Sequence, residues 1–268
     1  MTRPTRTLPF ALLLCLLAGP VPADAPAPPP SPRNIGGPGD FGLREKLVKR
    51  LTGEPGLANA GLKVALVNGG AVLSGTVPTW SLKRHALTMA GTARGIVNVT
   101  DQMQVFRGDV TDEEILTAVS RLLKERQETL GIQSFEVEVL DGGMTLSGTV
   151  KDFAARVRAE EVAGSVGGVT RIVNRLLPAD APSGADDASI RKAVATYLGN
   201  PRTYSYHGEI QIQVRESRVV MTGRLPYVLA RQQAGAMAAM VGGVSGVDNR
   251  IKVDPSVIMP GIIVKELP

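Results

Sequence analysis

Hydrophobic and polar residues alternate strictly along two short stretches of the chain. Phe135, Val137 and Val139 alternate with glutamates, and isoleucine and valine alternate with glutamines over residues 210–214. A period of two is typical of a strand with one buried face. Asp141-Gly142-Gly143 then gives a hairpin signal, whereas residues 216–218, Glu-Ser-Arg, require another turn geometry. We therefore predict two-stranded hairpins here.

Apolar residues recur at helical spacing in three segments of the chain, and each segment is predicted to form an amphipathic helix. The positions are Leu43, Leu47 and Leu51; Ile115, Val119 and Leu122; and Ile190, Val194 and Leu198. Thr111 and Glu114 form a capping box before the second of these helices. Alanine-rich segments at 80–90, 153–163 and 228–238 predict a second helix after each hairpin.

A short sequence motif occurs three times. VLSGTV begins at Val72, TLSGTV at Thr145 and VMTGRL at Val220, and their glycines are separated by 73 and 75 residues. The same two separations hold for two further sets of positions, Gly95, Gly168 and Gly243, and Asp101, Asn174 and Asn249. This register indicates an internal duplication.

Each copy is expected to fold as α-β-β-α-β in about 65 to 70 residues. The predicted class is α+β, with three tandem modules that each pack a small three-stranded sheet against two helices. The expected modules span residues 40–106, 110–177 and 186–254, with a linker at 178–185. The tail, 255–268, holds an apolar run that could add a strand or serve as a peptide for a partner.

Glycine ends the second strand of each copy, at Gly75, Gly148 and Gly223. The chain must leave the sheet there, and glycine permits a bulge or a close approach of backbone. The later glycines, at 95, 168 and 243, follow the alanine-rich helix and are expected to stop it. We interpret all six as structural.

The first residues have the pattern of an export signal. Arg3 and Arg6 precede an apolar run and a small-x-small cleavage pattern over residues 21–23. Residues 1–23 are therefore predicted to be a cleaved signal peptide, followed by a Pro/Gly-rich disordered linker at 24–39. An uncleaved anchor is the alternative. Leu14 stands where a lipoprotein signal has a small residue before its cysteine, Cys15, which disfavours lipidation.

Composition narrows the function. The 268 residues carry a net charge of +5, which falls to +3 without the signal, and no basic stripe of the kind that binds nucleic acid. Cys15 is the only cysteine, so the mature chain has no thiol. His85 and His207 occupy non-equivalent places, and no cluster has metal-ligand spacing. We therefore predict no catalytic site, no metal, no cofactor and no transmembrane helix in the mature chain.

Aromatic and basic residues meet at the start of each alanine-rich helix. This set comprises Trp80 with Lys83 and Arg84, Phe153 with Arg156 and Arg158, and Arg231 beside Tyr227. A ring at a membrane interface with cations on phosphate suits phospholipid head groups. The alternative is that the rings are buried against the sheet and the cations form a solvated face.

The repeated unit resembles the BON domain, named for bacterial osmotic-stress and nodulation proteins. MTLSGTV (144–150), VGGVTRIVN (166–174) and VGGVSGVDN (241–249) match its motifs, whereas the first copy reads ARGIVNVTD (93–101), with Asp101 in the Asn place. The resemblance implies a periplasmic, envelope-associated module linked to phospholipid binding, envelope integrity and osmotic stress. Two hypotheses follow: an exported, non-catalytic protein that binds anionic phospholipid, or a periplasmic scaffold for envelope proteins.

Overall fold

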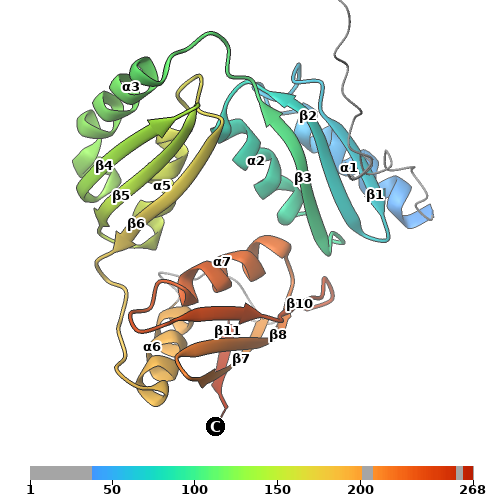
Figure 1. Ribbon diagram of the computed structural model, residues 1–268. Helices are drawn as coiled ribbons and strands as arrows, with labels where there is room; N and C mark the ends of the chain where they lie inside the picture. Colours follow the sequence, from blue (N-terminus) through green and yellow to red (C-terminus); the bar gives the residue numbers. More distant parts are fainter. Residues whose placement is uncertain (1–37, 201–207, 258–261, 268) are drawn as a thin grey trace, which may run out of the picture. The chain divides into compact units, whose positions relative to one another are not determined.

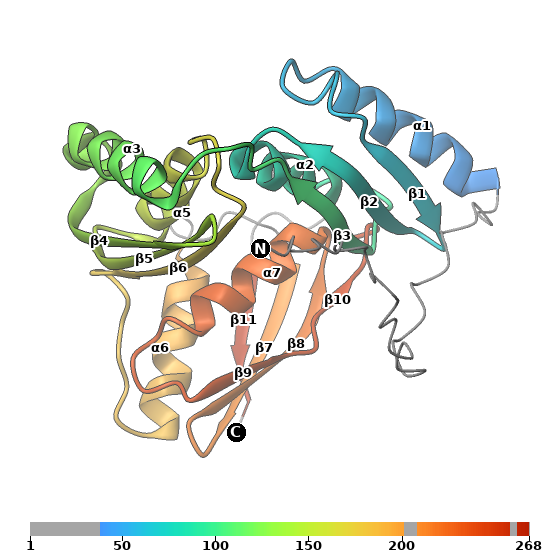
Figure 2. The ribbon, with the colours of Figure 1, turned by 45° about the horizontal axis from the view of Figure 1, so that its top comes forward.

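The computed structural model describes residues 38–200, 208–257 and 262–267, all of which lie in one unit of the chain. Three successive groups of helices and strands repeat the predicted order (Figures 1 and 2). We number these groups modules 1, 2 and 3. In each module the first two strands pair antiparallel and the second and third pair parallel. A helix crosses between the parallel strands, as such a connection requires.

Module 1 holds the elements predicted for the first copy. They are α1 (Pro38–Thr52), β1 (Lys63–Val67), β2 (Gly70–Val77), α2 (Trp80–Gly91) and β3 (Asn98–Val105). The sheet order is β1-β2-β3.

Module 2 adds one short helix to that plan. Its elements are α3 (Asp112–Glu125), α4 (Gln127–Leu130), β4 (Ile132–Leu140), β5 (Gly143–Val150), α5 (Phe153–Ala163) and β6 (Arg171–Pro178). The predicted capping box is present, because Thr111 and Glu114 exchange hydrogen bonds at the start of α3. Gly131, in the left-handed conformation, ends α4 and turns the chain into β4.

Module 3 departs from the plan at two places. Its elements are α6 (Asp187–Gly199), β7 (Gly208–Arg215), β8 (Arg218–Leu225), α7 (Val228–Ala238), β9 (Gly246–Asn249) and β10 (Lys252–Val253). The last strand, predicted as one piece, is therefore split in two. In addition, β11 (Ile262–Glu266) from the tail pairs parallel with β7 and widens this sheet (Figure 2).

Each module packs its two main helices on one face of its sheet around an aliphatic core. In module 2 this core joins α3, the sheet and α5. The buried residues of α3 are Ile115, Val119 and Leu123. The prediction of Leu122 on the buried face was therefore wrong, because a spacing of four carries the inward face to Leu123 while Leu122 is partly exposed.

An aspartate at the start of the first helix holds the hairpin turn in every module. In module 2 the backbone N–H groups of Asp141 and Gly142 donate to the two carboxylate oxygens of Asp112, at 2.7 and 2.9 Å. These bonds lower the pKa of Asp112, the bond from Gly142 most strongly, and Arg107 adds to the effect. Asp40 and Asp187 make the same pair of bonds in the other modules. Each hairpin is thus tied to the helix before it.

The glycine of each second strand has a backbone that other residues rarely adopt. Its φ is 119° at Gly75, 125° at Gly148 and 127° at Gly223. A Cβ at Gly148 would lie 2.3 Å from the carbonyl oxygen of Ser134 on the neighbouring strand. This geometry gives the physical reason for the repeated glycine: the two strands approach too closely for a side chain.

Candidate functional site

The residue that closes each repeat motif, an asparagine in modules 2 and 3, joins the third strand to the second helix. In module 2 the side-chain amide of Asn174 donates to the carbonyl of Arg156 at 3.1 Å and to the Glu160 carboxylate at 3.0 Å. Its oxygen accepts from the N–H of Leu176. Arg156 donates in return to the carbonyls of Asn174 and Leu176, at 2.6 and 3.2 Å. We call this network the helix–strand clamp.

The departure from the motif in module 1 is compensated within the same clamp. Asp101 replaces the asparagine, and a carboxylate has no N–H to donate. Instead, the Lys83 ammonium lies 3.0 Å from the Asp101 carboxylate and donates to the carbonyl of Met103 at 2.5 Å. In module 3 the clamp is again amide to carbonyl, because Asn249 donates to the carbonyl of Arg231 at 2.7 Å.

Four cations at the helix starts make side-chain contacts within the protein: Lys83, Arg84, Arg156 and Arg158. Lys83 and Arg156 belong to the clamps, and burial lowers the pKa of Arg156 while the Glu160 carboxylate opposes that shift. Arg84 lies 3.4 Å from Glu160 of module 2, and Arg158 lies 4.0 Å from Asp152. The structure thus brings Arg84, Phe153 and Arg156 of the predicted set together around one cavity, whereas the other members of the set do not line it.

The first residue of each second helix packs against the core of another module. The Trp80 ring of module 1 packs against the core of module 2, and Phe153 of module 2 is buried in the core of module 3. Val228 of module 3 is buried in the core of module 1. Phe153 is thus buried and Trp80 partly buried, each against a neighbouring module, whereas the alternative placed both rings against their own sheet. This makes the contacts cyclic: one to two, two to three and three to one.

Backbone contacts and glycines support the same order. The N–H of Ser81, beside Trp80, donates to the carbonyl of Gly164 at the end of α5. The Trp80 ring also lies against Gly164, where a Cβ would be 2.5 Å from the ring. At the end of α2, a Cβ at Gly91 would lie 3.4 Å from Leu229 of α7. Small residues at the helix ends thus allow close contact between modules.

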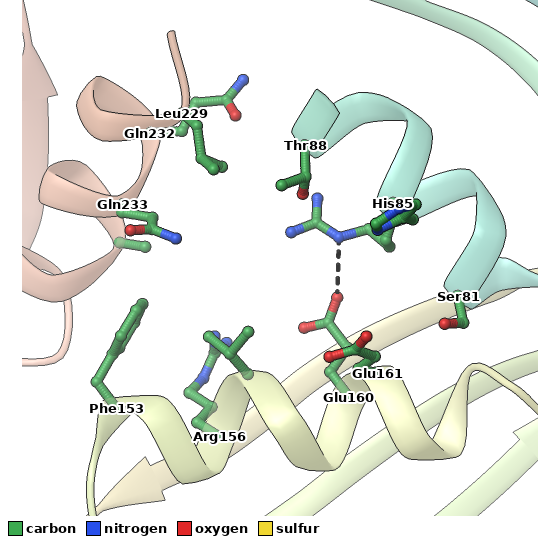
Figure 3. Close-up of a pocket in the computed structure, with 13 residues that line it drawn as sticks. Ser81, His85, Thr88, Phe153, Arg156, Glu160, Glu161, Leu229, Gln232 and Gln233 are labelled. Atoms are coloured by element: carbon green, nitrogen blue, oxygen red, sulfur yellow. Dashed lines mark ion pairs between the residues drawn. The ribbon is translucent and has the colours of Figure 1, made fainter. Parts of the chain in front are cut away.

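A cavity of about 440 Å³ lies where α2, α5 and α7 meet (Figure 3). Its lining includes equivalent positions of the three repeats: Arg84, Val157 and Gln232, and also Thr88, Glu161 and Ala236. The equivalent positions differ in chemistry, so the cavity presents no repeated ligand group. The dashed line in Figure 3 is the ion pair between Arg84 and Glu160, which joins two modules across it.

The free edge of the third sheet holds the tail strand. β11 pairs with Gly208–Ile212 of β7, and the N–H of Leu267 donates to the carbonyl of Ile212 at 2.8 Å. Lys265 lies 2.8 Å from Glu209, and Arg191 of α6 donates to the carbonyl of Leu267 at 2.8 Å. Of the two roles left open for the tail, the structure thus shows the added strand.

Two features of this site were outside the reach of the sequence prediction. The first is the set of aspartates that hold the hairpins. One aspartate stands 28 or 29 residues before each turn, and this regular spacing is a sequence signal. However, nothing in the neighbouring residues distinguishes these aspartates from solvent-exposed ones. The second is the pairing of the tail strand with β7, for which the sequence has no such spacing. His85 lies 3.5 Å from Glu54, whereas His207 lies outside the described residues.

Within the described ranges, no group of three or more His, Cys, Asp or Glu residues is placed to hold a metal ion. Among those same residues, no helix is both long enough and apolar enough to cross a membrane. The predicted signal peptide and most of the predicted linker lie outside the described residues.

Comparison with protein families decides what these modules are. The BON domain model matches residues 39–106, 111–177 and 186–255, most of the chain. The chain belongs to the BON domain family. The clamp asparagines and the strand-ending glycines are thus parts of three BON domains, and this match indicates no catalytic family.

Solved structures add little beyond this match. The C-terminal domain of CdsD, a structural protein of the type III secretion system of Chlamydia trachomatis, is 16% identical, with a TM-score of 0.23. That alignment covers 80% of this chain and 98% of that one. A second CdsD structure is also 16% identical, with a TM-score of 0.22, and covers 85% of this chain and 92% of that one. A search of curated proteins gave no match.

Proposed function

We propose that this BON protein is a non-catalytic scaffold that binds other proteins outside the cytoplasm. The observation that carries the proposal is β11, a strand from outside the α-β-β-α-β unit that pairs with the open edge of a BON sheet. Addition of a strand to a sheet edge is a general mode of peptide recognition, because main-chain hydrogen bonds provide affinity and side-chain pockets provide specificity. The basic and apolar N-terminal pattern supports export.

Two further edges of this kind support the proposal. β1 and β4 are the first strands of their sheets and each pairs on one side only among the described residues. Several linked sites of modest strength bind a multivalent partner more tightly than one site alone. A scaffold with repeated BON sheets would gain affinity in this way.

Phospholipid binding at the helix starts has less support. That function needs the rings and cations to face a membrane, and their contacts described above lie within and between modules. A net charge of +3 for the mature chain would provide only a weak attraction to an anionic surface.

One experiment with two arms separates these functions. A photo-reactive amino acid replaces Lys63 on β1 or Glu138 on β4, both exposed, in cells that make the protein. A scaffold gives covalent adducts with the same discrete proteins in repeated experiments. In the second arm, purified mature protein is floated with anionic or neutral vesicles at low salt. Flotation with anionic vesicles only, without protein adducts, would replace the scaffold with a lipid-binding function.

A further inference from the structure

The edge of module 2 that corresponds to the tail site of module 3 carries apolar residues and no added strand. Residues 75 positions before Ile210 and Ile212 are Phe135 and Val137. Ile210 and Ile212 are fully buried beside β11, whereas Phe135 and Val137 remain partly exposed at the edge of β4. Module 2 thus has the same edge without the strand that covers it.

The helix beside this edge has also changed in an informative way. Arg191 of α6 binds the end of the tail strand, through the carbonyl of Leu267 and the carboxylate of Glu266, which lies 3.4 Å away. The equivalent residue of α3 is Leu116, which is 38% exposed. An exposed leucine in place of this arginine favours an apolar residue where the tail has Glu266.

The exposed face of β4 sets the charge of a strand that would fit. Glu136 and Glu138 stand where β7 has Gln211 and Gln213, and both glutamates are exposed. In module 3 the residue paired with Gln211 is Lys265. A lysine at that place on module 2 would lie opposite Glu136, and opposite charges on neighbouring strands are favourable.

We propose that the open edge of β4, beside α3, binds an extended segment of another protein, parallel to β4, as β11 lies on β7. The segment alternates apolar and basic residues and ends in an apolar residue over Leu116. This proposal rests on the proposed scaffold function and names the chemistry of one partner. The chain's own tail is a poor occupant, because it is paired with β7 and carries Glu266 at the place where Leu116 favours an apolar side chain.

Two labelled peptides test the proposal by fluorescence anisotropy with the full mature chain. One has the sequence of residues 260–268, PGIIVKELP, and the other carries Glu266→Leu, PGIIVKLLP. We expect the leucine peptide to bind at least about fivefold more tightly than the native one, since burying a carboxylate against Leu116 is unfavourable. A scrambled leucine peptide that binds as well would overturn the proposal.

Protein variants assign the site. Glu136→Lys with Glu138→Lys should weaken binding of the leucine peptide by about threefold to tenfold, because the attraction between the peptide lysine and Glu136 becomes a repulsion between like charges and the lysine introduced at position 138 adds to it. Leu116→Arg should shift the preference towards the native peptide, as in module 3. Glu45→Lys, an exposed charge reversal in α1, is the matched control and should change nothing.

Other outcomes contradict the proposal in distinct ways. If Glu209→Lys weakens binding and the β4 variants do not, the peptide has displaced β11 from module 3. If light scattering shows a dimer that the β4 variants abolish, the occupant is a second copy of this chain. If the peptide does not bind at module 2 but protein adducts still form at position 63 of module 1, the module 2 proposal is wrong while the scaffold function is retained.

Discussion

Replacing Gly148 with alanine tests whether close contact between β4 and β5 is what requires the repeated glycine. At a φ of 125°, a residue with a Cβ is strained by about 1–3 kcal/mol. The added atom would also lie 2.3 Å from the carbonyl oxygen of Ser134 and 2.8 Å from the Cα of Phe135. Both neighbours are backbone atoms, so the two strands must separate, at about 1 kcal/mol for each hydrogen bond lost.

The sum, about 2–4 kcal/mol, is large for a module of this size. Because the modules bury side chains in one another's cores, we expect them to unfold as one unit. A unit of 150–250 residues shifts its midpoint by about 2–4 °C for each kcal/mol, so we expect the midpoint to fall by roughly 4–16 °C. Trp80 is the only tryptophan and packs against the core of module 2. Its fluorescence therefore reports the unfolding of module 2 during heating.

The matched control is Gly167→Ala. No atom lies within 4 Å of a Cβ at Gly167, and its φ is outside the positive region. Alanine there should leave stability unchanged or raise it by about 0.4–1 kcal/mol, because it restricts the unfolded chain. Equal midpoints for the two variants would refute the proposed reason for the glycine at position 148.

Three further predictions concern contacts inside and between the modules. Asn174→Asp should destabilise module 2 by about 1–3 kcal/mol, since it removes a hydrogen-bond donor and places a second carboxylate beside Glu160. In urea titrations Asn249→Asp should cost less, because the position equivalent to Glu160 is Gly235; equal losses would contradict the clamp. The pKa of Asp112 is lowered from 3.8 by folding, so the Asp112 carboxylate contributes its full stabilisation above pH 3.8. That stabilisation is lost as the pH falls through the pKa that Asp112 has in the folded protein. The difference in urea midpoint between wild type and Asp112→Asn should therefore shrink from pH 6 to pH 3. Trp80→Ala should speed hydrogen exchange in α5 of module 2, although the residue belongs to module 1, and unchanged exchange would argue against the contact.

Elements and their order could be predicted because their signals are local. The alanine-rich helices were expected at 80–90, 153–163 and 228–238, and the structure has α2, α5 and α7 within one residue of those bounds. Alternation, a turn and a glycine are written within a few neighbouring residues, and three copies show the same pattern in register. The prediction of BON domains is confirmed on this basis.

What could not be predicted depends on residues far apart in the sequence. An aromatic residue at a helix start looks the same whether it faces a membrane, its own sheet or a neighbouring module, so the place of Phe153 in the core of module 3 had no local signal. The pairing of β11 with β7 likewise joins segments more than 50 residues apart. Phospholipid contact by Arg84, Arg158 and their neighbours stays a prediction, which the flotation arm tests.

The exchange of core residues between modules bears on how the protein can be dissected. A fragment holding only module 1 would lose Val228 from its interior and leave the indole of Trp80 without its apolar surroundings. A fragment holding only module 2 would expose Phe153 to solvent in the same way. Such fragments would bind non-specifically through apolar surface that is buried in the intact protein. Ligands are therefore best mapped by point substitutions in the intact chain.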